Sequence, residues 1–225
     1  MQLFKPKRTP NQMLEDSAVK GDDRGVIRAL RKGAQINQRG EGGWPAIACA
    51  ANYNRPKTLK LLLEYGADIN LSTEDKKETA LIIAARTFNI ECVRILLAHK
   101  ADVNAKDREG ETAFLKIAFS NEEYIARLLL ENGADIDAMD RYGETALSGP
   151  LKHERFERVR FLLEHGADLG MAIGKWGLED YANKNMAKYV EECKVKIEAM
   201  KGIAASAKKD ELEDIIESLN SDLRK

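Results

Sequence analysis

The stretch that decides the fold is Gly66-Ala67-Asp68-Ile69-Asn70, because close copies of it recur along the chain. Their first residues are spaced 33, 34, 33 and 33 positions apart. Self-similarity at a fixed period of this length is the signature of a repeat protein. The other copies are Lys100-Ala101-Asp102-Val103-Asn104, Gly133-Ala134-Asp135-Ile136-Asp137, Gly166-Ala167-Asp168-Leu169-Gly170 and a weaker one, Gly33-Ala34-Gln35-Ile36-Asn37.

A second phrase keeps the same period. It reads Glu78-Thr79-Ala80-Leu81, Glu111-Thr112-Ala113-Phe114 and Glu144-Thr145-Ala146-Leu147. The separation between the two phrases is one residue longer in the first copy, so the extra residue falls within Ser72–Lys77. Two phrases locked at one period indicate a repeated structural unit rather than chance similarity.

Each unit predicts two helices. A leucine-rich stripe at helical spacing precedes each Gly-Ala-Asp phrase, with a basic residue on its solvent side. The glycine that follows suits the left-handed residue that ends a helix, and Lys100 takes its place in one copy. A threonine before a shorter apolar helix suits an N-cap, because its hydroxyl accepts a backbone N–H of the first turn. The basic residues are Lys60, Arg94, Arg127 and Arg160, and the expected caps are Thr79, Thr112 and Thr145.

The unit is therefore a helix, a tight turn, a longer helix and an extended loop, and neighbouring units must stack to bury their apolar faces. This period and pattern resemble ankyrin repeats over about residues 12–192. No copy has the family's histidine, and the fourth has Gly149-Pro150 within its first helix, which should distort or shorten that helix. The resemblance implies an all-α solenoid of stacked helix-turn-helix units with protruding loops, followed by a C-terminal helical extension.

The repeat register divides the chain into segments. We expect an N-terminal tail (1–11) and an ankyrin-repeat domain (12–193), followed by a C-terminal helical extension (194–225). The domain comprises a cap (12–39), four full repeats (40–73, 74–107, 108–140 and 141–173) and a closing repeat (174–193). In the extension, Leu212, Ile215, Ile216, Leu219 and Leu223 form an apolar stripe. We expect this stripe to dock on the C-terminal end of the stack in a monomer; packing against another chain is the alternative.

Composition narrows the function classes. Hydrophobic residues make up 44% of the chain, enough for a buried core, and the net charge of −1 gives no basic excess of the kind a general nucleic-acid binder needs. Cys49, Cys92 and Cys193 form no paired spacing, which favours a reducing compartment. No apolar run reaches membrane-spanning or signal-peptide length. We therefore expect a cytoplasmic protein with no nucleic-acid or membrane partner.

Motifs for chemistry are missing from the sequence. The three histidines stand alone, and His99 and His165 share one repeat position, where a helix C-terminus explains them. No metal-ligand spacing, phosphate-binding loop or nucleophile elbow occurs. The repetition of the Asp in the Gly-Ala-Asp phrase favours a structural role in a turn. Cys49 and Cys92 fall on repeat positions that we expect to be buried. We expect no catalytic residue, cofactor or metal.

The resemblance implies instead that a protein partner binds the concave face formed by loop tips and first helices. Aromatic and arginine side chains dominate binding energy at such surfaces. Trp44 stands out because it lies between a glycine-rich loop tip and a helix-opening proline, whereas Phe119 and Trp176 have packing between repeats as an equal alternative. The expected contacts are Trp44, Tyr53, Lys76, Arg86, Arg108, Phe119, Arg141 and Tyr142.

The leading hypothesis is therefore a non-enzymatic protein-interaction module, acting as an adaptor, inhibitor or targeting subunit. Two alternatives stay open: a structural or self-assembling protein that uses the C-terminal helix, and an enzyme whose site the sequence does not reveal. A thin solenoid offers few deep pockets for chemistry, which disfavours the enzyme. The sequence does not name the partner.

Overall fold

The structure is a computed structural model that describes residues 8–174 and 182–206. Within these ranges the chain forms twelve helices and no strand, with one isolated bridge between Arg39 and Pro45. The predicted all-α class is therefore confirmed. The chain divides after Ala146 into two compact units, which are described in turn.

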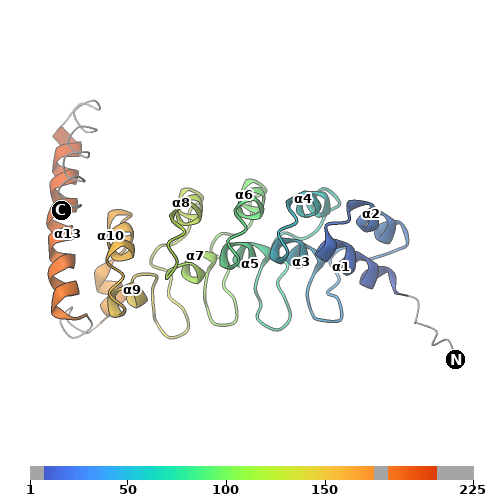
Figure 1. The fold of residues 1–225 in the computed structure, drawn as a ribbon, viewed down its shortest axis with the longest axis horizontal. Helices are drawn as coiled ribbons and strands as arrows, with labels where there is room; N and C mark the ends of the chain where they lie inside the picture. Colours follow the sequence, from blue (N-terminus) through green and yellow to red (C-terminus); the bar gives the residue numbers. More distant parts are fainter. Residues whose placement is uncertain (1–7, 175–181, 207–225) are drawn as a thin grey trace. The chain divides into compact units, whose positions relative to one another are not determined.

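The first unit consists of four helix pairs stacked side by side (Figure 1). The first helices of successive pairs contact one another in the order α1, α3, α5 and α7, and the second helices in the order α2, α4, α6 and α8. The bounds are α1 Pro10–Lys20, α2 Asp23–Arg31, α3 Ala46–Asn52, α4 Pro56–Glu64, α5 Ala80–Arg86, α6 Ile90–Ala98, α7 Ala113–Lys116 and α8 Glu123–Glu131.

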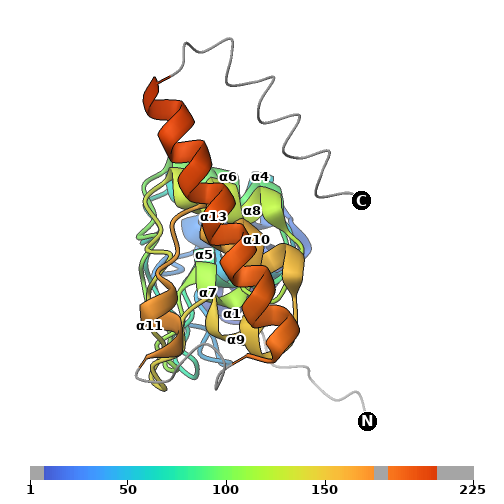
Figure 2. The ribbon, with the colours of Figure 1, turned by 90° about the vertical axis from the view of Figure 1, so that its left-hand side faces the viewer.

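The second unit contains α9 Ser148–Lys152, α10 Phe156–Glu164, α11 Leu169–Ile173 and α13 Lys184–Ser206. The long helix α13 packs against α10 (Figure 2), where the rings of Phe156 and Tyr189 meet edge to face at 5.1 Å. It runs through residue 193, where we expected the closing repeat to end. Trp176 and the apolar stripe of Leu212, Ile215, Ile216, Leu219 and Leu223 lie outside the described residues.

The Gly-Ala-Asp phrases form the predicted turns. Gly66, Gly133 and Gly166 have φ angles of +85°, +86° and +90°, and Lys100 takes the same left-handed conformation at +62°. In each phrase the aspartate accepts a hydrogen bond from the backbone N–H two residues later, as Asp68 Oδ1 does from Asn70 at 3.0 Å. The repeated carboxylate therefore has the structural role that its repetition predicted.

The same phrase also links neighbouring repeats of the first unit. Asn37 Oδ1 accepts from the backbone N–H of Asp68 at 2.7 Å, Asn70 from Asp102 at 2.9 Å, and Asn104 from Asp135 at 2.8 Å. These side chains satisfy backbone donors that lie outside any helix. The asparagine at the end of the phrase is thus part of the contact between neighbouring repeats.

Two of the three expected threonine caps are confirmed. Thr79 and Thr112 accept the backbone N–H of the third helical residue of α5 and α7. The third expectation was wrong: α9 begins at Ser148, its N-cap is Leu147, and no side chain caps it. The reason is Pro150, which has no N–H to donate and is tolerated only in the first turn of a helix, so that α9 starts later and is five residues long.

Candidate partner-binding surface

A loop, here called a finger, precedes the first helix of each repeat. The four fingers are residues 40–44, 73–78, 107–111 and 140–144. A backbone hydrogen bond closes each one, from Gly40 to Trp44, Thr73 to Glu78, Asp107 to Glu111 and Asp140 to Glu144, at 2.9 to 3.0 Å. The second finger is one residue longer than the others, at the place where the sequence predicted the extra residue.

Neighbouring fingers are joined by backbone hydrogen bonds. Glu74 N–H donates to the Gly43 carbonyl at 2.9 Å, Arg108 to Lys76 at 2.8 Å, and Arg141 to Glu109 at 2.9 Å. Three such bonds join the four fingers into one continuous row, here called the finger strip. The strip holds its tip residues in fixed positions, because each finger is anchored to the next.

The tip side chains differ in how firmly they are held. Tyr142 is 70% exposed, and the Arg141 guanidinium lies over its ring at 4.8 Å and donates to its hydroxyl at 2.6 Å. The same guanidinium is 3.4 Å from the Glu109 carboxylate. Arg108 donates to the Glu74 carbonyl at 3.2 Å, and Trp44 is half-buried. Arg141 and Tyr142 therefore form a paired, pre-positioned group.

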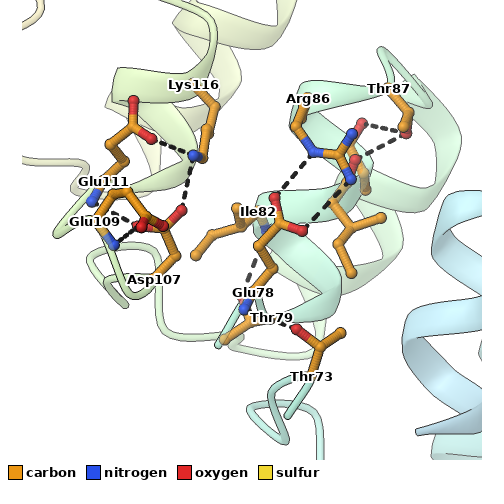
Figure 3. Close-up of polar contacts among 12 residues, drawn as sticks. Thr73, Glu78, Thr79, Ile82, Arg86, Thr87, Asp107, Glu109, Glu111 and Lys116 are labelled. Carbon is orange, nitrogen blue, oxygen red and sulfur yellow. Dashed lines mark hydrogen bonds and ion pairs between the residues drawn. The ribbon is translucent and has the colours of Figure 1, made fainter. Parts of the chain in front are cut away.

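Two ion-pair clusters lie behind the second and third fingers (Figure 3). In the second repeat, Arg86 Nε is 2.9 Å from Glu78 Oε1, and the Glu78 side chain is only 2% exposed. In the third repeat, Lys116 Nζ is 2.7 Å from Asp107 Oδ2 and also contacts Glu111. Asp107 Oδ1 in turn accepts the backbone N–H groups of Glu109 and Glu111, both at 2.9 Å.

The pKa of Lys116 is raised above its usual 10.5. Burial by itself lowers the pKa, but the hydrogen bonds and charges of Asp107 and Glu111 outweigh that effect. Lys116 is therefore a fixed cation at neutral pH, and its charge is balanced within its own repeat.

The eight predicted contact residues lie in three places: on the finger strip, at the end of α5 and at the turns between helices. Trp44, Lys76, Arg108, Arg141 and Tyr142 belong to the finger strip, and Arg86 lies at the C-terminal end of α5. Tyr53 is the C-cap residue of α3 and is 50% exposed, and Phe119 follows α7 and is 55% exposed. Both lie at turns between helices, away from the fingers. Phe119 is therefore accessible over about half of its surface, and both its predicted contact with a partner and its packing against neighbouring repeats stay predictions.

Sequence reasoning missed several exposed apolar residues and one cluster. Phe88, Ile90 and Tyr124 are 45%, 38% and 48% exposed, near the turns that join the two helices of a repeat. The signal for the Asp107–Lys116 pair was available, because Lys116 stands where the second repeat has Ile83, 33 residues earlier. A lysine at an otherwise apolar repeat position calls for a buried carboxylate nearby.

Two histidines and two cysteines lie in structural positions. Nδ1 of His99 and of His165 is 2.8 and 2.7 Å from the carbonyl oxygen four residues earlier, at the end of α6 and α10. Burial raises the pKa of the Cys49 thiol to about 12 and that of Cys92 to about 11, so both stay protonated at neutral pH.

No group of three His, Cys, Asp or Glu residues able to hold a metal occurs among residues 8–174 and 182–206. In the same ranges no helix has the length and apolar character that crossing a membrane requires.

Comparison with known proteins agrees with this repeat architecture. The family model for ankyrin repeats in three copies matches residues 16–107 and 102–172. Human ankyrin repeat and SOCS box protein 6 is 35% identical over 115 residues, which is 48% of this chain and 27% of that protein. An ankyrin repeat domain-containing protein of Stachybotrys chartarum is 34% identical over 109 residues, 48% of this chain and 6% of that protein. A putative ankyrin repeat protein of fowlpox virus is 47% identical over 51 residues, 23% of this chain and 11% of that protein.

The chain is a helical repeat protein with an exposed row of loops, and it belongs to the ankyrin-repeat family. Ankyrin repeats are protein-interaction units, generally without enzymatic activity, so that the chain is a protein-interaction module. It spans less than a third of the length of each of the relatives above.

Proposed function

We propose that the chain is a non-enzymatic adaptor, inhibitor or targeting subunit that binds a protein partner on the concave face of its repeats. The contact surface consists of the finger strip and the adjoining ends of the first helices. Its expected anchors are Trp44, Lys76, Arg86, Arg108, Arg141 and Tyr142. The other two predicted contacts, Tyr53 and Phe119, lie at the turns after the first helices and outside this surface. We further propose that it acts in the cytoplasm as a monomer.

The observation that carries this proposal is the row of backbone hydrogen bonds between fingers. Side chains on a rigid row lose little conformational freedom when a partner binds, which favours affinity. Arg141 and Tyr142 are of the residue types that dominate interface energy, and their mutual contact holds them in one exposed arrangement. Arg108 is tied to the neighbouring finger through the Glu74 carbonyl.

Affinity capture with quantitative mass spectrometry tests the proposal. The full chain should capture a stable hetero-partner, and Arg108→Ala and Tyr142→Ala should each weaken its binding by more than about 1 kcal/mol. Trp44→Ala should weaken binding similarly, with some loss of stability because Trp44 is half-buried. Tyr65→Ala is the matched control, because Tyr65 is 49% exposed at the end of α4 and outside the proposed surface.

Unchanged affinity in all three variants, with loss of binding on substitution in the second helices, would contradict the assignment of this surface. Capture of nothing but further copies of the chain would favour the structural or self-assembling alternative. Thermal unfolding of each variant shows whether lost binding reflects a lost contact or a lost fold.

A further inference from the structure

A second apolar surface lies where the two helices of the second and third repeats are joined. Phe88 follows α5 and Ile90 begins α6, while Phe119 follows α7 and Tyr124 lies in the first turn of α8. All four side chains are between 38 and 55% exposed. Because α5 contacts α7 and α6 contacts α8, the two turns are neighbours. These four residues are called the turn patch below.

Phe88 is held in an unfavourable backbone conformation. Its φ angle is +57°, a region that L-residues rarely adopt and bulky ones least of all. Asn54 and Glu154, in the equivalent turns of the first and fourth repeats, are polar residues at φ +51° and +55°. The Phe88 ring remains 45% exposed, so that burial does not explain an aromatic residue here. Strain kept at an exposed apolar side chain indicates a function.

The half of the patch that belongs to the second repeat is also held by hydrogen bonds. Asn89 Nδ2 donates to the carbonyl oxygens of Ala51 and Asn52 in the preceding repeat, at 2.7 and 3.3 Å, and to Thr87 Oγ1 at 2.8 Å. These bonds fix the turn that carries Phe88 and Ile90. A surface that does not need ordering on binding favours affinity.

Tyr124 is positioned by the neighbouring helix. Arg94 Nη1 donates to the Tyr124 hydroxyl at 3.4 Å. Arg94 lies four residues after Ile90 on α6, so the two side chains share one face of that helix. Tyr124 therefore lies on the same side of the repeats as Ile90.

The border of the patch is acidic. Three carboxylates, Glu91, Glu122 and Glu123, adjoin its residues in the sequence. Glu123 is 3.6 Å from Arg127, and Arg86 is paired with Glu78. Within residues 8–174 and 182–206, Glu91 and Glu122 have no ion-pair partner, against the single charge of Arg94. The net negative border favours a partner with positive charges beside its apolar residues.

The spacing of the two turns favours a helix over an extended strand. Packed helices, and hence the two turns, are separated by about 10 Å. Helical residues seven apart lie on one face and are about 10.5 Å apart along the axis. Residues on one face of a strand are separated by about 6.6 or 13 Å, which fits less well. We propose that the turn patch binds an amphipathic helix of a partner protein whose apolar face is flanked by lysine or arginine residues.

The probe for this proposal is a fluorescein-labelled synthetic helix of leucines and lysines, with leucines at positions i, i+3, i+4 and i+7. The full chain should bind this peptide in fluorescence anisotropy, and a leucine–glutamate peptide of the same pattern should bind far more weakly. Phe88→Gly should raise the dissociation constant about tenfold. The same variant should keep or raise the thermal midpoint, because it removes the strained residue.

Three further variants complete the design. Ile90→Ser tests the patch without changing the strained backbone and should also weaken binding. Tyr65→Ala removes an aromatic ring of similar exposure at the far end of α4 and should leave binding unchanged. Tyr142→Ala should leave binding of this peptide unchanged, which separates the turn patch from the finger strip.

Equal affinity of wild type, Phe88→Gly and Ile90→Ser for the leucine–lysine peptide would overturn the proposal. Equal binding of the leucine–glutamate peptide would overturn the charge preference, and with it the proposed partner. If light scattering shows a dimer that Phe88→Gly dissociates, the occupant is a second copy of the chain and the proposal is wrong.

Discussion

The second and third repeats share one framework but balance their polar groups differently. Ile83 of α5 and Lys116 of α7 occupy equivalent positions, and Ile83 is fully buried. Lys116 instead reaches the carboxylates of Asp107 and Glu111. At the place of Asp107 the second repeat has Thr73, whose hydroxyl accepts the Glu78 backbone N–H at 3.1 Å.

The repeat accepts either an apolar or a charged residue at this position, but the two place different demands on their neighbours. An isoleucine needs only apolar neighbours, whereas a largely buried lysine is stable only with carboxylates in reach. Lys116 therefore depends on a carboxylate nearby, whereas Ile83 does not. The helices of both repeats pack against those of their neighbours, so that stacking depends on neither solution.

The largest effect should come from the part that the two repeats share. Leu96 of α6 and Leu129 of α8 are both fully buried, so that Leu96→Ala and Leu129→Ala should each reduce the free energy of unfolding by about 2–5 kcal/mol. Urea unfolding measures the loss. Lys60→Ala, on the exposed side of α4, is the control and should have little effect. Equal losses in all three variants would mean that the repeat register is wrong.

The next effect should separate the two repeats. Asp107→Ala removes one of the two carboxylate partners of Lys116 and the acceptor of two backbone N–H groups, and should cost about 2–3 kcal/mol in urea unfolding. Thr73→Val, at the equivalent place, removes one acceptor and should cost about 1 kcal/mol.

The double variant Asp107→Thr/Lys116→Ile sharpens this comparison. It gives the third repeat the residues of the second, so its stability should recover most of the loss, since replacing a buried ion pair by apolar packing is often neutral. If the loss of stability in the double variant equals the sum of the losses in Asp107→Thr and Lys116→Ile, the two residues are not coupled. The third repeat could then not adopt the residues of the second without loss.

The free energy of unfolding at alkaline pH should distinguish the lysine of the third repeat from the isoleucine of the second. A lysine whose pKa is higher in the folded state contributes stability that is fully present below its unfolded pKa and is lost as the pH rises through the folded value. The pKa of Lys116 is raised above 10.5. The stability difference between wild type and Lys116→Ile should therefore be constant near neutral pH and should change above about pH 10.5. A difference that stays flat to about pH 12 would show that Lys116 is not held by its carboxylates.

The shared framework was predictable because local rules determine it. The φ angles of Gly66 and Lys100 follow from the helix end that the Gly-Ala-Asp phrase marks, and the caps at Thr79 and Thr112 follow from their place before an apolar run. Thr145 satisfied the same local rule and failed, because Pro150 moved the start of the helix. Local patterns are reliable until a residue a few positions away changes the hydrogen bonding.

The site was less predictable because exposure depends on the neighbouring repeat. For Phe119 the sequence left partner contact and packing against neighbouring repeats as equal alternatives, and only the stacked helices show that the residue is 55% exposed. The sequence did not indicate that Phe88 is exposed, because an aromatic residue directly after an apolar helix is typical of a buried core. Its positive φ and exposure become visible only once the turn is built.

The smallest effect concerns the residue that ends the second helix of each repeat, where the second repeat has Lys100 and the third has Gly133. Both are left-handed, at φ +62° and +86°. A β-carbon added to Gly133 would meet no atom within 4 Å, so the penalty for Gly133→Ala comes from the backbone alone and should be about 1 kcal/mol. Lys100→Gly removes such a penalty but gives the unfolded chain more freedom, which offsets part of the gain. It should therefore stabilise by only about 0.5 kcal/mol, seen as a small rise in the urea midpoint with an unchanged slope. If Lys100→Gly instead destabilises the protein, the lysine side chain contributes more at this helix end than the backbone strain takes away, and the two repeat ends are not equivalent.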